Sequence, residues 1–264
     1  EDMVGGGPFN LRAGEWTDDT SMALCLAESL LTQGTFDAND QMQRYCRWMD
    51  DGHLSSTGDC FDIGNTVANA LERYRLTRDP FAGSTHARSA GNGSLMRLAP
   101  VALFYHPDRA QAVHYAAESS RTTHGAPEAV DACAIFAEML CRALDGATKA
   151  DVLAVDPPPQ ASERLASVCS GAYRGREAAQ ISGSGYVVDC LEAALWCYDQ
   201  SDDFRSAVLL AANLGDDADT TDAVTGQIAG ATYGVGAIPH EWLDKLALRA
   251  QLTAFADGLL DGPR

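Results

Sequence analysis

The chain has 264 residues, 46% of them apolar, which is enough to bury a substantial core. Its formal net charge of −18 argues against binding to nucleic acid or to an anionic membrane surface, because both require a face rich in Lys and Arg. No apolar run reaches the length of a membrane span, and no secretory signal is visible. We therefore expect a soluble cytoplasmic protein, with a monomer favoured and the oligomeric state otherwise open.

Eight cysteines are spread along the chain without any C-x-x-C pair. Most lie inside apolar helical patterns, as Cys25 does between Leu24 and Leu26. This distribution is typical of small buried residues in a reducing compartment. Neither a disulfide framework nor a zinc site is expected.

The first predicted helix follows a Gly- and Pro-rich loop and covers residues 17–33. Thr17 is a good N-cap, Asp18 and Asp19 suit a first turn, and Gly34 is a typical stop. Apolar periodicity and breaker residues predict further helices along the rest of the chain. They are expected at residues 38–50, 63–74, 95–104, 108–119, from the segment 123–128 to about 144, 160–170, 187–198, 203–213 and 221–234, and the last helices are expected within about 240–257.

The sequence shows no convincing strand alternation and no repeat of fixed period. Its strongest break, Asp156-Pro157-Pro158-Pro159, is interpreted as a surface loop and not as a domain linker. Small residues in the predicted helix 221–234, including Gly226 and Gly230, would allow neighbouring helices to come close. The expected fold is all-α, with a single globular multi-helix domain over residues 1–264.

Two segments combine acidic and hydroxyl side chains where a loop becomes a helix. They are Thr17-Asp18-Asp19-Thr20 and Asp216-Asp217-Ala218-Asp219-Thr220. Helix capping, worth about 1 kcal/mol per cap, would explain either segment alone. However, a cap needs only one or two oxygens, and adjacent carboxylates repel one another unless a cation lies between them.

Mg²⁺ and Mn²⁺ prefer six hard oxygens, which Asp, Thr and water provide. One segment is too poor in ligands for two ions, but two segments that face each other would suffice. Two ions about 4 Å apart can polarise a substrate oxygen and activate a water molecule. Spacing in the sequence does not decide whether the two segments meet.

The two acidic motifs, Gly14-Glu15-Trp16-Thr17-Asp18-Asp19-Thr20-Ser21-Met22-Ala23 and Asn213-Leu214-Gly215-Asp216-Asp217-Ala218-Asp219-Thr220, resemble the metal motifs of ADP-ribosylglycohydrolases. The likeness is closest to bacterial dinitrogenase reductase-activating members. It extends in the expected order over the intervening strings Asp62-Ile63-Gly64, Gly91-Asn92-Gly93-Ser94-Leu95-Met96-Arg97, Thr123-His124 and Gly185-Tyr186-Val187-Val188. The combination is specific, although each string alone would be weak.

This resemblance implies an all-α fold with a central cleft that holds two Mg²⁺ or Mn²⁺ ions. One side of the metal site would be formed by Thr17, Asp18 and Asp19, and the other by Asp217, Asp219 and Thr220. Asp216 is left out of the ligand set because other members often have Gly at that position.

The resemblance also implies the substrate contacts. Asn92, Gly93 and Ser94 would bind the diphosphate and ribose, with Met96 nearby, and the alternative for this loop is a plain turn. His124 would face the ADP-ribose, although a lone His is more often structural. Tyr186 could stack on adenine or could be a core aromatic. These contacts define the expected substrate-binding set.

Asp62, Asp18 and Asp19 are the candidate catalytic residues. The likeness suggests that Asp62 lies beside the scissile bond, and helix capping is the alternative. The family usually begins with a helix containing Gly-Asp-Ala-Leu-Gly, followed by a mobile Glu near the metals. That stretch would lie before Glu1, and Glu15 does not match the mobile Glu. We therefore expect lid closure, and full activity, to depend on residues outside this sequence.

The expected reaction is hydrolysis of the glycosidic bond between ADP-ribose and a modified protein side chain of the arginine or serine type. The bond would break at ribose C1″ through a transition state of oxocarbenium character. Three alternatives remain open from the sequence. They are an ADP-ribose-binding relative without turnover, another two-metal hydrolase such as a phosphatase, and an acidic helical scaffold.

Overall fold

The structure, a computed structural model, describes residues 2–262. This part of the chain is helical and contains no β-strand beyond isolated bridges, so the predicted all-α class is confirmed. Three short 3₁₀ turns, η1 (Ala87–Ser89), η2 (Ala178–Gln180) and η3 (Val235–Ala237), accompany the α-helices. The α-helices are α1 (Asp18–Gln33), α2 (Ala38–Asp51), α3 (Asn65–Thr77), α4 (Ala99–Tyr105), α5 (Arg109–Arg121), α6 (Pro127–Leu144), α7 (Lys149–Leu153), α8 (Glu163–Cys169), α9 (Val187–Asp199), α10 (Phe204–Ala212), α11 (Ala218–Tyr233), α12 (His240–Leu243) and α13 (Arg249–Leu260).

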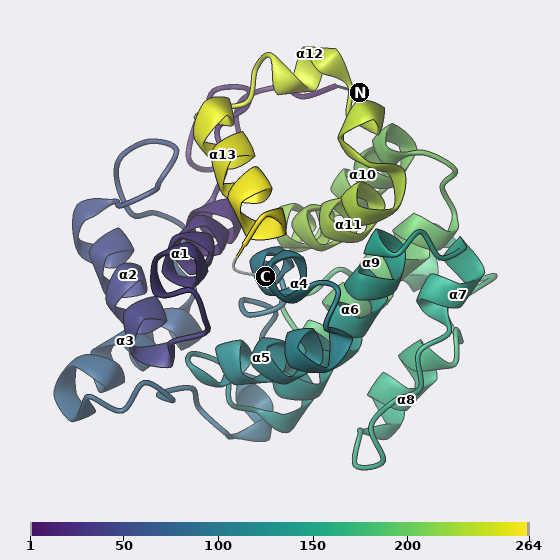
Figure 1. The fold of residues 1–264 in the computed structure, drawn as a ribbon. Helices are drawn as coiled ribbons and strands as arrows, with labels where there is room; N and C mark the ends of the chain where they lie inside the picture. Colours follow the sequence, from purple (N-terminus) through teal and green to yellow (C-terminus); the bar gives the residue numbers. More distant parts are fainter. Residues whose placement is uncertain (1, 263–264) are drawn as a thin grey trace.

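Helices α6, α9 and α11 form the centre of the core (Figure 1). Helix α6 begins at Pro127, whose missing N–H suits a first turn, and most of its side chains are buried. Helix α9 is buried over nearly its whole length, from Val187 to Tyr198. A helix that is apolar on all sides needs partners on all sides, and α9 packs against α6, α8, α10 and α11.

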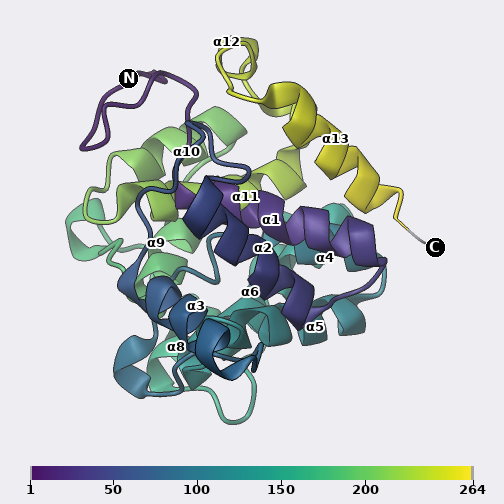
Figure 2. The ribbon, with the colours of Figure 1, turned by 90° about the vertical axis from the view of Figure 1, so that its left-hand side faces the viewer.

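The ends of the molecule are covered by separate helices. Helices α1, α2 and α3 lie on one side of the centre and α7 and α8 on the other (Figure 1). Figure 2 shows α12 and α13 at one end, opposite α5 and α8. No helix of residues 2–262 combines the length and the apolar character that crossing a bilayer would require.

Several helix boundaries differ from those predicted. The helix expected at 95–104 begins only at Ala99, because the preceding residues form successive turns. The helix expected at 221–234 begins at Ala218, inside the acidic motif. The last helices, expected within about 240–257, are α12 and α13, and α13 extends to Leu260 after Leu248 in the left-handed conformation at φ 50°. Helix α7, capped by the Thr148 side chain, was missed because it has only 5 residues.

The expected close packing at Gly226 is not observed. A Cβ built there would meet nothing within 4 Å. Helix α11 instead contacts its neighbours α6, α9 and α10 through larger buried side chains such as Val224 and Ile228. The helix is central, as predicted, and among its small residues Ala229 is fully buried and a Cβ on Gly230 would stand 3.8 Å from the Phe204 ring.

Candidate active site

The beginnings of α1 and α11 meet in the folded chain. The Thr17 hydroxyl lies 2.8 Å from Asp19 Oδ2 and 3.2 Å from Asp219 Oδ2. Thr17 and Asp219 are separated by 202 positions in the sequence. The two acidic segments therefore lie side by side, as the metal hypothesis requires.

Capping does not explain the polar residues at these two helix ends. Thr17 and Asp217 occupy the N-cap positions of α1 and α11, yet neither side chain accepts a capping hydrogen bond. In contrast, the Asp37 side chain at the start of α2 accepts from two backbone N–H groups, and that of Asp203 at α10 accepts from one. The Thr17 hydroxyl is instead bonded to the carboxylates of Asp19 and Asp219, and Asp217 accepts from Asn92, so neither side chain caps its own helix.

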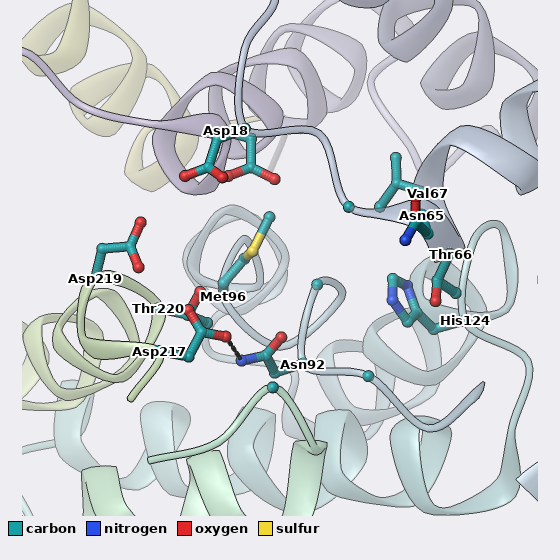
Figure 3. A pocket seen from close by; sticks show the side chains of 15 residues that line it. Asp18, Asn65, Thr66, Val67, Asn92, Met96, His124, Asp217, Asp219 and Thr220 are labelled. Atoms are coloured by element: carbon teal, nitrogen blue, oxygen red, sulfur yellow. Dashed lines mark hydrogen bonds between the residues drawn. The ribbon is translucent and has the colours of Figure 1, made fainter. Parts of the chain in front are cut away.

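A cavity of about 300 Å³ opens beside these helix ends (Figure 3). Carboxylates line one side of it, and the 91–93 loop, the first turn of α3 and His124 line the other. The lining residues are Asp18, Asp62, Gly64, Asn65, Thr66, Val67, Gly91, Asn92, Gly93, Met96, His124, Gly185, Asp217, Asp219 and Thr220.

The carboxylates of α1 are buried without a compensating cation. Asp18 and Asp19 are 8% and 4% exposed. Burial raises the pKa of both groups, and the negative charges of neighbouring carboxylates raise it further. Neither residue forms an ion pair within residues 2–262, and Asp19 Oδ1 has no hydrogen-bond partner there. The cluster therefore lacks neutralising partners in the part of the chain that the structure describes.

Asp62 and Asp219 complete the acidic side of the cavity. Partial burial raises the pKa of Asp62, and the charges of Asp219 and Asp217 raise it further. The pKa of Asp219 is raised by burial first and by Asp217 second. Asp62 is not a helix cap, because Gly64 occupies the N-cap of α3.

Asp222 is an acidic residue near the cluster that the sequence prediction missed. Its Oδ1 is buried and has no partner within residues 2–262. Burial, together with the charges of Asp19 and Asp219, raises its pKa to about 8. Asp222 lies one helical turn after Asp219, so a helix that included both residues would have placed them on one face. The predicted helix began only at residue 221 and left Asp219 out.

The donor chemistry fits hard divalent cations. Unpartnered buried oxygens on Asp19 and Asp222, with few nearby donors, are what a cation would satisfy. However, residues 2–262 contain no group of three His, Cys, Asp or Glu side chains gathered closely enough to hold an ion as they stand. The ligands would have to close around the metal when it binds.

The opposite side of the cavity offers hydrogen-bond donors. Asn92 Nδ2 donates to Asp217 Oδ2 at 2.8 Å, which joins this loop to the acidic side (Figure 3). The backbone N–H groups of Gly93 and Ser94 have no acceptor within the described chain. The nearby α3 begins at Asn65, and its first N–H groups are free of intrahelical partners, as at any helix start.

Two predicted substrate residues do not line this cavity. The Ser94 hydroxyl lies 2.8 Å from Ser120 Oγ and accepts from Cys133 Sγ, so only the backbone of Ser94 is available to a ligand. Tyr186 lies at an adjoining depression of about 570 Å³. Its hydroxyl donates to Glu128 Oε2 at 2.7 Å.

The remaining predicted residues are distributed as follows. Met96 and Thr220 line the cavity, whereas Thr17 and Asp19 do not, although Thr17 is bonded to the lining residue Asp219. Asp216, which was left out of the ligand set, accepts from Ser182 Oγ at 3.2 Å and does not line the cavity. Lining residues that the prediction did not select are Gly64, Asn65, Thr66, Val67, Gly91 and Gly185.

Comparison with known proteins gives consistent matches over the whole chain. A family model described as ADP-ribosylglycohydrolase matches residues 1–264. The ADP-ribosylarginine hydrolase Tri1 of Pseudomonas putida (strain GB-1) is 46% identical over 261 residues, covering 98% of this chain and 70% of that protein. The ADP-ribosyl-[dinitrogen reductase] glycohydrolase of Rhodospirillum rubrum is 31% identical over 252 residues, covering 94% and 79%. A solved structure described as an ADP-ribosylglycohydrolase-related protein complex superposes with a TM-score of 0.86 at 46% identity, covering 98% of this chain and 86% of that one.

Proposed function

Because the chain belongs to the ADP-ribosylglycohydrolase family, we propose that it hydrolyses the bond between ADP-ribose and an arginine side chain of a modified protein, with the help of two Mg²⁺ or Mn²⁺ ions. The observation that carries this proposal is the meeting of the acidic starts of α1 and α11 at one cavity. Two relatives named ADP-ribosylarginine hydrolase, at 46% and 44% identity, support arginine over serine as the acceptor.

The metal ligands would come from both helix starts. The residues that would hold the ions are Thr17, Asp18, Asp19, Asp217, Asp219 and Thr220. The unpartnered Oδ1 of Asp19 and the absence of capping by Thr17 and Asp217 support this assignment. When bound, the ions would supply Lewis acidity toward substrate oxygens and water.

The diphosphate would bind on the side of the cavity that carries donors. The free N–H groups of Gly93 and Ser94, together with the N-terminus of α3, are suited to an anion. With the diphosphate on this side, the ribose end of the substrate would lie toward the metal ligands across the cavity. This orientation brings the bond to the acceptor residue near Asp62.

The electrostatics of the cavity favour a cationic acceptor. An arginine that carries ADP-ribose presents a guanidinium group, which Asp62, a carboxylate outside the metal ligand set, would attract. A serine O-glycoside has no such charge. In the reaction, water adds to ribose C1″ as the C1″–nitrogen bond breaks, and the leaving nitrogen takes up a proton. Asp62 would move that proton, because its side chain makes no hydrogen bond within residues 2–262 and its pKa is raised.

The test is to offer ADP-ribosyl-arginine and ADP-ribosyl-serine peptides with Mg²⁺, with Mn²⁺ and with chelator, and to measure free ADP-ribose. We expect release from the arginine peptide that requires metal and is lost in Asp217→Asn. The control Asp216→Asn changes the adjacent acid, which lies outside the cavity, and should retain activity. Tight ADP-ribose binding without release would indicate a binding protein, and release of phosphate would indicate a different two-metal hydrolase.

A further inference from the structure

Arg97 is a buried cation without an acidic partner. Its side chain is 0% exposed, and it forms no ion pair within residues 2–262. Its guanidinium lies over the Tyr45 ring, 4.6 Å from the ring centre, and donates to Gly93 O at 3.1 Å and to Thr123 Oγ1 at 2.8 Å. Burying a charged group is unfavourable unless its N–H donors find acceptors. The acceptors of Arg97 therefore indicate its role.

Thr123 connects Arg97 to the cavity. Its hydroxyl is fully buried and lies 2.8 Å from His124 Nδ1. A guanidinium can only donate, so Thr123 Oγ1 must accept from Arg97. The hydroxyl still carries its own proton, and within residues 2–262 the only other polar atom bonded to it is His124 Nδ1.

We infer that Thr123 fixes His124 as the tautomer protonated on Nε2, and thereby presents an N–H donor to the cavity. If Nδ1 carried the proton instead, the Thr123 oxygen would accept twice, and its own buried proton would have no acceptor. Buried polar groups in folded proteins are rarely left in that condition. Thr123 is therefore a positioning residue, and Arg97 sets the direction of the hydrogen-bond chain.

The surroundings of His124 support this arrangement. Burial and the Arg97 charge lower the pKa of His124 to about 3, so near neutral pH the ring carries a single proton. The His124 main chain is held by Ser120, which accepts from His124 N and donates to His124 O. The Nε2 atom has no acceptor within the described chain. Nε2 lies beside the 91–93 loop, because a Cβ on Gly93 would stand 3.2 Å from it.

A ring nitrogen that donates selects an acceptor oxygen as its ligand. A phosphate or ribose hydroxyl oxygen meets this requirement, whereas an unprotonated Nε2 would repel phosphate. That this ligand is ADP-ribose rests on the proposed function. The assignment of the His124 tautomer does not depend on it. The two can therefore be tested separately.

The tautomer is tested by ¹⁵N NMR of the His124 ring in the whole ligand-free chain at neutral pH. We expect a protonated Nε2 and an unprotonated Nδ1. Thr123→Val removes the hydroxyl and should produce a mixture of tautomers or the opposite one, while Thr123→Ser should keep the wild-type spectrum. The matched control is Thr122→Val, because Thr122 is also fully buried and accepts from Arg97 but its hydroxyl makes no hydrogen bond with His124. A protonated Nδ1 in the wild type, or an unchanged spectrum in Thr123→Val, would overturn the inference.

The consequence for binding is tested by calorimetry with ADP-ribose. We expect about tenfold weaker binding for Thr123→Val, equivalent to about 1.4 kcal/mol, and a change below about threefold for Thr123→Ser and Thr122→Val. Equal affinities for Thr123→Val and the wild type would contradict a donor role toward this ligand. If ADP-ribose does not bind to the wild type while the Nε2–H tautomer is observed, the proposed function fails and the assignment of the tautomer stands.

Discussion

Thr17 and Asp219 are in hydrogen-bond contact although 202 positions separate them in the chain. The contact joins two helix starts whose carboxylates have no cationic partner within residues 2–262. The folded chain thus holds like charges together, which is unfavourable until something positive binds between them. The expected responses of the protein to metal and to pH follow from this arrangement.

Divalent metal should stabilise the protein. We expect Mn²⁺ or Mg²⁺ to raise the melting temperature, because the ion binds the folded cluster and not the unfolded chain. At a hundredfold excess over the dissociation constant the gain is about 2.7 kcal/mol. Scanning calorimetry with and without chelator measures it. Asp219→Asn should lose most of the gain, and Asp216→Asn should keep it. A metal response that is identical in all three proteins would show that the ions bind elsewhere.

Asp222 should make the metal-free protein less stable as pH rises. Its folded pKa of about 8 lies above the ordinary value of about 3.9 for an unfolded Asp. A raised pKa contributes stability that is fully present below the unfolded pKa and is lost as pH rises toward the folded pKa. Between pH 5 and 8, in chelator, the wild type should therefore lose more stability than Asp222→Asn. Denaturant unfolding at several pH values tests this, and parallel curves for the two proteins would refute it.

Asp62 should affect turnover more than binding. Asp62→Asn removes the group that would move the proton but leaves the loop and the donors at residues 93 and 94 in place. We expect kcat to fall by about 10²- to 10³-fold and ADP-ribose affinity to change by less than about threefold. Initial rates on an ADP-ribosyl-arginine peptide and calorimetry separate the two effects. A loss confined to KM would point to a binding role instead.

Gly93 should not tolerate a side chain. A Cβ there would stand 2.9 Å from His124 Cε1, so the imidazole would have to move. We expect Gly93→Ala to weaken ADP-ribose binding at least about tenfold, with a smaller effect on the fold. Gly236→Ala is the control, because a Cβ at that position meets nothing within 4 Å. Calorimetry on both variants provides the comparison, and tight binding by Gly93→Ala would contradict the proposed ligand position.

Ser94 should contribute stability and not side-chain binding. Its hydroxyl is directed to Ser120 and Cys133. Ser94→Ala should therefore cost about 1 kcal/mol of unfolding free energy, and should change ADP-ribose affinity by less than about twofold. Denaturant unfolding and calorimetry check the two parts. A large loss of affinity in a stably folded Ser94→Ala would show that the hydroxyl turns into the cavity.

The sequence predicted the fold class and most helices because apolar periodicity and capping signals act locally. The stop of α1 at Gly34, with φ 66°, is an example. Boundaries were wrong where local signals competed. Ala218 and Asp219 were placed before the predicted helix start at residue 221, whereas the structure includes them in the first turn of α11. The start of α13 follows Leu248, which adopts the left-handed conformation although it is not a glycine. This boundary therefore had no signal in the sequence.

The candidate site was predictable where a motif carries its own chemistry. The carboxylates of Asp18 and Asp217 belong to short acidic strings, and both line the cavity. Arg97 was missed because its environment depends on packing between distant segments. Nothing in the string around Arg97 indicates that its guanidinium is fully buried without a carboxylate. Such features become visible only when the neighbours are known.

The main chain of residues 183–185 is hydrogen-bonded to both sides of the cavity. Gly183 O accepts from Asp217 N at 2.9 Å, and Gly185 O accepts from Asn92 N at 3.1 Å. The same peptide strap therefore anchors both walls, two residues apart. Adding or deleting one residue between positions 183 and 185 would shift the two walls relative to each other, so the length of this segment should be constrained, and Gly183 should also resist substitution because a Cβ there would stand 2.7 Å from Thr221 Oγ1.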